Sequence, residues 1–195
     1  MSSPVIPDLG NISKAMQAAA GQSALALQDI VSYPVDLAFS EMELISEANK
    51  EICIPFLTSQ STVVKLHFDG GLEGAGFLIL SEGQDQRLAE ALFTQDAALQ
   101  ETENAVEMVL CEIGNVLLNV YIGTLANYAH THVRYHVPQL FLRKENTVWA
   151  EELFASHIPP HQILILKNAL IIGEISISTH VVIVMKYSEY DKKSL

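Results

Sequence analysis

Apolar and polar residues recur along this chain with two different periods, and the periods separate helical from extended segments. Between residues 12 and 31 the apolar side chains follow helical spacing, and Pro34 limits the helix beyond its C-terminal end. A longer helix is expected over 101–129, and a short amphipathic one over 84–93. The packing stripe of the long helix consists of Val106, Val109, Leu110, Ile113, Leu117 and Val120.

Strand patterns follow each of the two long helices. Residues 34–39 alternate and predict a short strand, whereas 41–60 fit either a helical turn or a loop. A hairpin is expected at 61–81, where the Gly-rich turn GGLEG joins two strands. Residues 133–137 alternate again, and 161–187 contain two apolar strands with a glycine turn between them.

The order of helix, short strand, irregular stretch and hairpin therefore occurs twice. A shift of 98 residues overlays the two helix–strand units without a gap and places Val35 on Val133. We expect one domain over 1–195, built from pseudo-repeats at about 11–95 and 101–190. Because strands follow the helix in each half, the predicted class is α+β, with two long helices packed together on one face of a mainly antiparallel sheet.

Composition places the chain among globular proteins, because half of its residues are hydrophobic and only 17% are charged. The formal net charge of −12 disfavours nucleic acid and anionic membrane surfaces as partners. Cys53 and Cys111 show no metal-binding or disulfide spacing. We see no signal peptide and no uninterrupted apolar run of roughly 20 residues, so we expect a soluble cytoplasmic protein.

Two polar residues interrupt the apolar helix at 101–129. Glu112 and Asn115 are three residues apart, so their side chains share one face. Either both are surface polar groups, or Asn115 satisfies a backbone group at a helix–helix crossing, or the two form a functional pair. Asn119 lies one turn further along this face, where a contact at the rim of a site is expected rather than a catalytic role.

Three other features invite a chemical interpretation. His130, His132 and His136 would share one face of a strand, but neither a carboxylate nor a fourth ligand stands out nearby, so we expect no metal site. Cys111 is expected to be a buried core thiol. The run GGLEGAG lacks a lysine and precedes a strand, which favours a hairpin turn over a phosphate-binding loop.

Glu112, Asn115 and Pro138 form the pattern E-x2-N-x22-P. This pattern resembles the signature of the CheC/CheX/FliY family of chemotaxis phosphatases, and the run CEIGNVLLNVY resembles the helix that carries it. The resemblance covers nearly the whole chain, because CheC-type members are built from a duplicated helix-plus-strands unit of about this length.

The chain departs from the family pattern at two places. The family has Asp or Ser four residues before the glutamate, where this chain has Met108, which would either pack against the partner or mark a loss of activity. In the first half, the 98-residue shift places other residues at the signature positions, so that half resembles a degenerate copy and one site is expected. These residues are Lys14, Gln17 and Ser40.

The resemblance implies a hydrolase that removes phosphate from the aspartyl-phosphate of a CheY-like receiver domain in chemotaxis or two-component signalling. Asn115 would orient the attacking water, Glu112 would contact the active-site lysine of the receiver, and Pro138 would have a structural role. Met108 and Asn119 would contact the partner. The chain itself would bind no cofactor, because the Mg²⁺ ion belongs to the receiver.

Two other functions fit the same residues. One is a non-catalytic CheC-like module that binds a receiver, a CheD-like protein or a flagellar switch component. The other is a small-molecule sensor that uses the cleft between the two helices. Met108 and the degenerate first half favour the module, whereas the intact Glu112 and Asn115 favour the enzyme.

Overall fold

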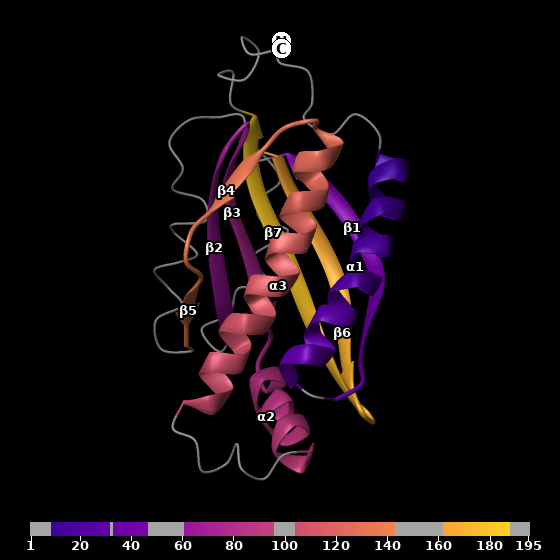
Figure 1. The fold of residues 1–195 in the computed structure, drawn as a ribbon, viewed down its shortest axis with the longest axis vertical. Coiled ribbons are helices and arrows are strands. Elements are labelled where there is room, and N and C mark those ends of the chain that lie inside the picture. Colours follow the sequence, from indigo (N-terminus) through magenta and orange to yellow (C-terminus); the bar gives the residue numbers. More distant parts are fainter. Residues whose placement is uncertain (1–8, 32, 47–60, 96–103, 143–161, 188–195) are drawn as a thin grey trace.

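A computed structural model describes residues 9–31, 33–46, 61–95, 104–142 and 162–187. These residues form three helices and one seven-stranded sheet (Figure 1). In chain order the elements are α1 (Leu9–Val31), β1 (Val35–Ser46), β2 (Thr62–Gly70), β3 (Leu72–Leu80), α2 (Gln84–Gln95), α3 (Ala105–Tyr128), β4 (Val133–Tyr135), β5 (Gln139–Phe141), β6 (Gln162–Ile172) and β7 (Ile175–Tyr187).

The sheet has the order β1-β6-β7-β3-β2-β4, and β5 also pairs with β2. All of the pairings between these strands are antiparallel. The hairpins β2–β3 and β6–β7 meet in the middle of the sheet, and the strands that follow the long helices lie toward its two edges. This arrangement confirms the predicted α+β class. The internal duplication stays a prediction. Counted from either edge, the sheet starts with a strand that follows a long helix and continues with a hairpin, β6–β7 on one side and β2–β3 on the other.

Helices α1 and α3 lie side by side on one face of the sheet, and α2 lies near one end of it (Figure 1). Their inward side chains form one core with the facing strand residues, including Met16 and Leu27 from α1 and Leu117 from α3. The Tyr121 hydroxyl in this core donates a hydrogen bond of 2.8 Å to Asn168 Oδ1 on β6. The two long helices therefore cover one sheet face, as the sequence predicted.

Helix α3 is long and apolar enough to cross a membrane, judged by length and composition alone. Its structural setting gives a different explanation for this apolar character. Ten of its residues are buried, and the helix packs against α1, β2 and β3. We therefore interpret α3 as the central core helix of the domain.

Strand β1 is longer than predicted, because it continues through residues that were expected to form a turn or loop. The alternation changes phase between Phe39 and Glu41, where the pairing with β6 contains a bulge. Leu37 and Phe39 pack against the helix-side core before the bulge, and Met42 and Leu44 do so after it. The extra residue at the bulge shifts the alternation of apolar and polar residues by one position, so the full length of the strand was not recognised from the sequence. Residues 47–60 of the predicted irregular stretch, including Cys53, lie outside the described residues.

The turn between β2 and β3 is also shorter than the predicted GGLEG loop, because β3 begins at Leu72. Gly70 supplies the turn with a φ of 124°, a conformation that side-chain-bearing residues rarely adopt. The predicted hairpin itself is confirmed. Both faces of the sheet bury apolar side chains, since a second cluster with Phe77, Ile163 and Val182 lies on the face away from α1 and α3. Burial on both faces explains the nearly continuous apolar runs of β6 and β7.

Candidate functional site

The predicted site residues lie on one stripe of α3. Met108, Glu112, Asn115 and Asn119 are separated by four, three and four residues, so a helix presents them on the same side. We call these four residues the α3 ridge. Met108 is 65% exposed and Glu112 is exposed, whereas Asn115 and Asn119 are half-buried. The structure therefore brings these four predicted residues together, with the exposed end of the ridge near the start of α3.

The two asparagines of the ridge contact each other. Asn119 Nδ2 donates a hydrogen bond of 2.9 Å to Asn115 Oδ1. The hydroxyl of Tyr135 on β4 donates to the backbone oxygen of Asn119 at 3.2 Å. Gly123 leaves room for this approach, because a Cβ atom there would lie 3.1 Å from the Tyr135 hydroxyl oxygen. Residues four apart on a helix are neighbours, so the contact between Asn115 and Asn119 follows from their spacing. The contact of Tyr135 with Asn119 joins two elements and does not follow from spacing.

Pro138 lies in the break between the two short edge strands. β4 ends at Tyr135, and β5 begins directly after Pro138, so the proline separates two strands rather than capping one. Beside it, Val137 is 83% exposed, which is unusual for a side chain of this kind. β4 and β5 both contact α3, so this edge of the sheet borders the helix that carries the ridge.

Cys111 is not suited to act as a nucleophile. Cys111 is half-buried and not the core residue that the sequence predicted. Its partial burial, followed by the negative charges of Glu107 and Glu112, raises the pKa of its thiol. The nucleophilic form of cysteine is the thiolate, and a raised pKa makes it scarcer at neutral pH. The polar groups that the ridge offers are the carboxylate of Glu112 and the carboxamides of Asn115 and Asn119.

The first half of the chain presents different groups at the corresponding positions. Lys14 and Gln17 are both exposed on α1. The hydroxyl of Ser40 donates to the backbone oxygen of Lys167 at 2.9 Å, which is a contact within the sheet. α1 thus presents an amine and a longer amide where α3 presents its carboxylate and its asparagine.

The three histidines of the H-x-H-x3-H run do not share a strand face. β4 spans only three residues, with His130 in a turn at a φ of 51° before it and His136 after it. His136 Nε2 instead lies 2.8 Å from Asp69 Oδ2. Within the ranges that the structure describes, no group of three or more His, Cys, Asp or Glu side chains is arranged to hold a metal ion.

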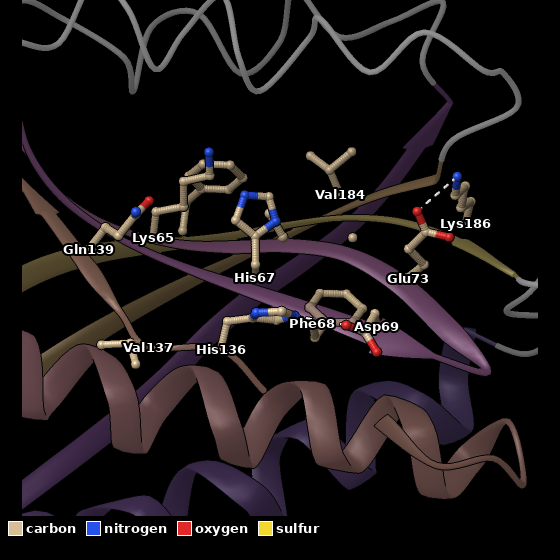
Figure 2. A pocket seen from close by; sticks show the side chains of 13 residues that line it. Lys65, His67, Phe68, Asp69, Glu73, His136, Val137, Gln139, Val184 and Lys186 are labelled. Carbon is tan, nitrogen blue, oxygen red and sulfur yellow. Dashed lines mark hydrogen bonds and ion pairs between the residues drawn. The ribbon is translucent and has the colours of Figure 1, made fainter. Parts of the chain in front are cut away.

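A hollow on the other face of the sheet was not predicted. Its lining side chains lie beside β2 and β3 (Figure 2). The cavity volume is about 420 Å³. The sequence signal for it is the row of polar residues at alternate positions of β2, since Lys65, His67 and Asp69 all line the hollow. Its other lining residues are Phe68, Glu73, Gly74, Ala75, Phe77, His136, Val137, Gln139, Val184 and Lys186.

Charged groups around this hollow pair with one another. Asp69 accepts a hydrogen bond of 2.8 Å from Arg134 Nε in addition to its contact with His136. The hydrogen bonds from His136 and then Arg134 lower the pKa of the Asp69 carboxyl. Lys186 forms an ion pair of 3.0 Å with Glu73 (Figure 2). The Asp69–His136 and Glu73–Lys186 contacts thus lie at the rim of the hollow.

No family model matches the chain, and no curated protein matches it in sequence. Solved structures are nevertheless similar to it. FliY from Thermotoga maritima matches with a TM-score of 0.60 and 15% identity, covering 94% of this chain and 91% of that one. The FliM middle domain from Vibrio alginolyticus matches with a TM-score of 0.57 and 11% identity, covering 92% of both chains.

A third similar structure comes from a FliG–FliM complex of H. pylori. It matches with a TM-score of 0.54 and 10% identity, covering 88% of this chain and 92% of that one. At such identities the likenesses show the fold. They confirm the fold that the resemblance to the CheC/CheX/FliY family predicted.

Proposed function

We propose that this chain is a phosphatase that hydrolyses the aspartyl-phosphate of a CheY-like receiver domain, in chemotaxis or two-component signalling, at a single site on the α3 ridge. The observation that carries the proposal is the placement of an exposed Glu112 and a half-buried Asn115 on one helix face of a FliY-like fold. The cytoplasm, where receiver domains are phosphorylated, is the proposed location.

The reaction asks little of the phosphatase beyond positioning. An aspartyl-phosphate is already an activated acyl phosphate, and hydrolysis needs a water molecule in line with the phosphorus. A carboxamide has an oxygen that accepts hydrogen bonds and a nitrogen that donates two, so one side chain can hold a water in a single orientation. We assign this role to Asn115, which is half-buried and contacts Asn119.

Glu112 supplies the docking contact in this proposal. Its exposed carboxylate lies one turn before Asn115, at a rise of about 4.5 Å along the helix axis, so both side chains can enter one cleft of a partner. We propose that it pairs with the active-site lysine of the receiver. This ion pair would set the register that brings Asn115 to the phosphoryl group, while the receiver would hold the Mg²⁺ ion.

The two ends of the ridge would complete the contact with the receiver. Met108 is 65% exposed at the N-terminal end, where a flexible thioether can adapt to an apolar patch on the partner. Asn119 lies at the other end of the ridge and is less exposed. We therefore propose that Met108 contributes to affinity more than to the chemical step.

A non-catalytic interaction module is the second candidate. It is favoured by the fold that the chain shares with the FliM middle domain and with a structure from a FliG–FliM complex. The methionine at position 108 in place of an acid or serine also favours it. Such a module would bind a receiver, a CheD-like protein or a flagellar switch component through the same ridge. It would not hydrolyse an aspartyl-phosphate.

One experiment separates the two candidates. Receiver domains from the same organism are phosphorylated with acetyl phosphate and Mg²⁺, and the decay of the phosphorylated form is followed with and without the chain. Acceleration that disappears in the Asn115→Ala variant supports the phosphatase. Binding of a beryllofluoride-loaded receiver without accelerated decay supports the module, and the absence of acceleration with every receiver contradicts the enzyme.

A further inference from the structure

We infer that Asn119 is a positioning residue, which holds the carboxamide of Asn115 in one orientation through the hydrogen bond between their side chains. The inference rests on the proposed role of Asn115, and it adds a second residue that determines the orientation of the Asn115 carboxamide. It differs from the role expected from sequence, in which Asn119 was a contact at the rim of the site.

The contact between the two asparagines fixes which atom of Asn115 is held. Asn119 Nδ2 lies 2.9 Å from Asn115 Oδ1, a normal distance for an amide hydrogen bond. The bond occupies one of the two acceptor positions on that oxygen. The second acceptor position of Oδ1 and both hydrogens of Nδ2 remain available to a water molecule or a phosphoryl oxygen.

The surroundings of Asn119 favour this orientation over the reverse one. Asn119 Oδ1 is buried and has no hydrogen-bond partner among the residues that the structure describes. If the Asn119 amide were rotated by half a turn, two N–H donors would occupy that place instead of one oxygen. Buried N–H groups without partners are rarer in proteins than oxygens with an unused acceptor position. Asn119 therefore acts as the donor, and Asn115 Oδ1 as the acceptor.

Asn119 is itself held by the edge of the sheet. The hydroxyl of Tyr135 on β4 donates to its backbone oxygen at 3.2 Å, and the absence of a side chain at Gly123 permits this approach. The chain of contacts runs from β4 to the turn of α3 at Asn119 and from there to Asn115. The bond from Tyr135 reaches the backbone at Asn119, and only the bond from Asn119 Nδ2 restricts the Asn115 side chain. A restricted Asn115 side chain loses less conformational freedom when the reacting groups meet, which lowers the cost of positioning the water.

The first test measures the dephosphorylation kinetics of full-length variants with a phosphorylated receiver. Asn119→Leu removes the donor and leaves Asn115 in place, so we expect kcat to fall about five-fold with little change in KM. Asn127→Leu is the matched control, because Asn127 is an exposed asparagine further along α3. An unchanged kcat in Asn119→Leu, or a change confined to KM, would overturn the positioning role, provided that both variants have the unfolding temperature of the wild type.

The second test needs no receiver and so remains decisive if the proposed function fails. In the wild type, one side-chain amide proton of Asn119 should be shifted downfield and exchange slowly in NMR spectra, and Asn115→Ala should abolish both signatures. In Asn119→Asp the residue can only accept, so the amide of Asn115 should turn and its own protons should acquire the shift. Asn119 amide signals that are identical in wild type and Asn115→Ala would contradict the inference.

Discussion

Glu112 and Asn115 divide the proposed reaction into docking and chemistry, and their environments suit this division. Glu112 is exposed, so a partner can reach its charge without displacing other parts of the protein. Asn115 is half-buried and is held by a neighbour on the next turn. A charge that guides docking is more effective when a partner can reach it. A group that orients water is more effective when its side chain is restricted to one conformation.

The charge of Glu112 should control affinity. We expect Glu112→Gln to weaken binding of a beryllofluoride-loaded receiver several-fold and to reduce the salt dependence of binding, because the lost ion pair is screened by salt. Titrations at low and high ionic strength measure both effects. Glu107→Gln changes the net charge equally from another side of α3 and should leave binding nearly unchanged. Equal effects of the two variants would contradict the docking role.

The Asp69 cluster gives a prediction about pH. Hydrogen bonds from His136 and Arg134 lower the pKa of Asp69 in the folded protein. The stabilising contribution of a carboxyl with a lowered pKa is present above its unfolded-state pKa and is lost as the pH falls through the folded-state value. Asp69→Asn should therefore be destabilising at neutral pH, and the difference from wild type should shrink as the pH falls below about 4.

Denaturant unfolding at several pH values measures this difference. Asp36→Asn is a suitable control, because Asp36 is an exposed carboxylate on another strand, β1. A difference between Asp69→Asn and wild type that is constant over the acidic range would show that the pairs at Asp69 do not stabilise the fold in the way described.

At the scale of elements, the helices were predictable because apolar residues recur at helical spacing along the buried side of each one. α1 and α3 lie close to their predicted bounds, and the hairpins β2–β3 and β6–β7 were also found. β1 was predicted too short because its bulge shifts the alternation by one residue. A period count assumes an unbroken strand, so a bulge ends the pattern without ending the strand.

The site could be predicted only in part, for a related reason. The α3 ridge follows from helix spacing, and the contact between Asn115 and Asn119 is the kind that pairs four residues apart make. The approach of Tyr135 depends on how β4 lies against α3, and the hollow depends on the pairing of β2 with its neighbours. The relative position of such elements is only weakly indicated by the pattern of residues in a single sequence.

The packing of α3 on β2 yields a test of stability. A Cβ atom at Gly114 would lie 2.6 Å from Val64 Cγ1 and 2.7 Å from Val64 Cβ. Alanine in a helix interior is favoured over glycine by about 1 kcal/mol, but overpacking of a core costs about 1–3 kcal/mol. We expect Gly114→Ala to lower the free energy of unfolding.

The steric origin of this effect can be isolated in a second background. Val64→Ala removes Cγ1 and Cγ2 of Val64 but keeps the Cβ that would lie 2.7 Å away, so Gly114→Ala should remain destabilising there but cost less than in the wild type. Denaturant unfolding of the four proteins measures the coupling. Equal effects of Gly114→Ala in both backgrounds would contradict the proposed packing.

The whole molecule is a domain with two long helices, of which α3 carries the proposed site. α3 presents a carboxylate and a carboxamide on its ridge, whereas α1 presents Lys14 and Gln17 at the corresponding positions. Both helices help to bury the same core, so the difference between them concerns their exposed faces. The expected consequence is that a single substitution on α3 removes all activity.

The most direct measurement is the decay rate of a phosphorylated CheY-like receiver in the presence of wild type, Asn115→Ala or Gln17→Ala at equal concentration. We expect wild type and Gln17→Ala to accelerate decay equally, and we expect Asn115→Ala to lower the acceleration by about 10²-fold, to near the rate of the receiver alone. Acceleration by Asn115→Ala at the level of the wild type would contradict the assignment of the site to the α3 ridge.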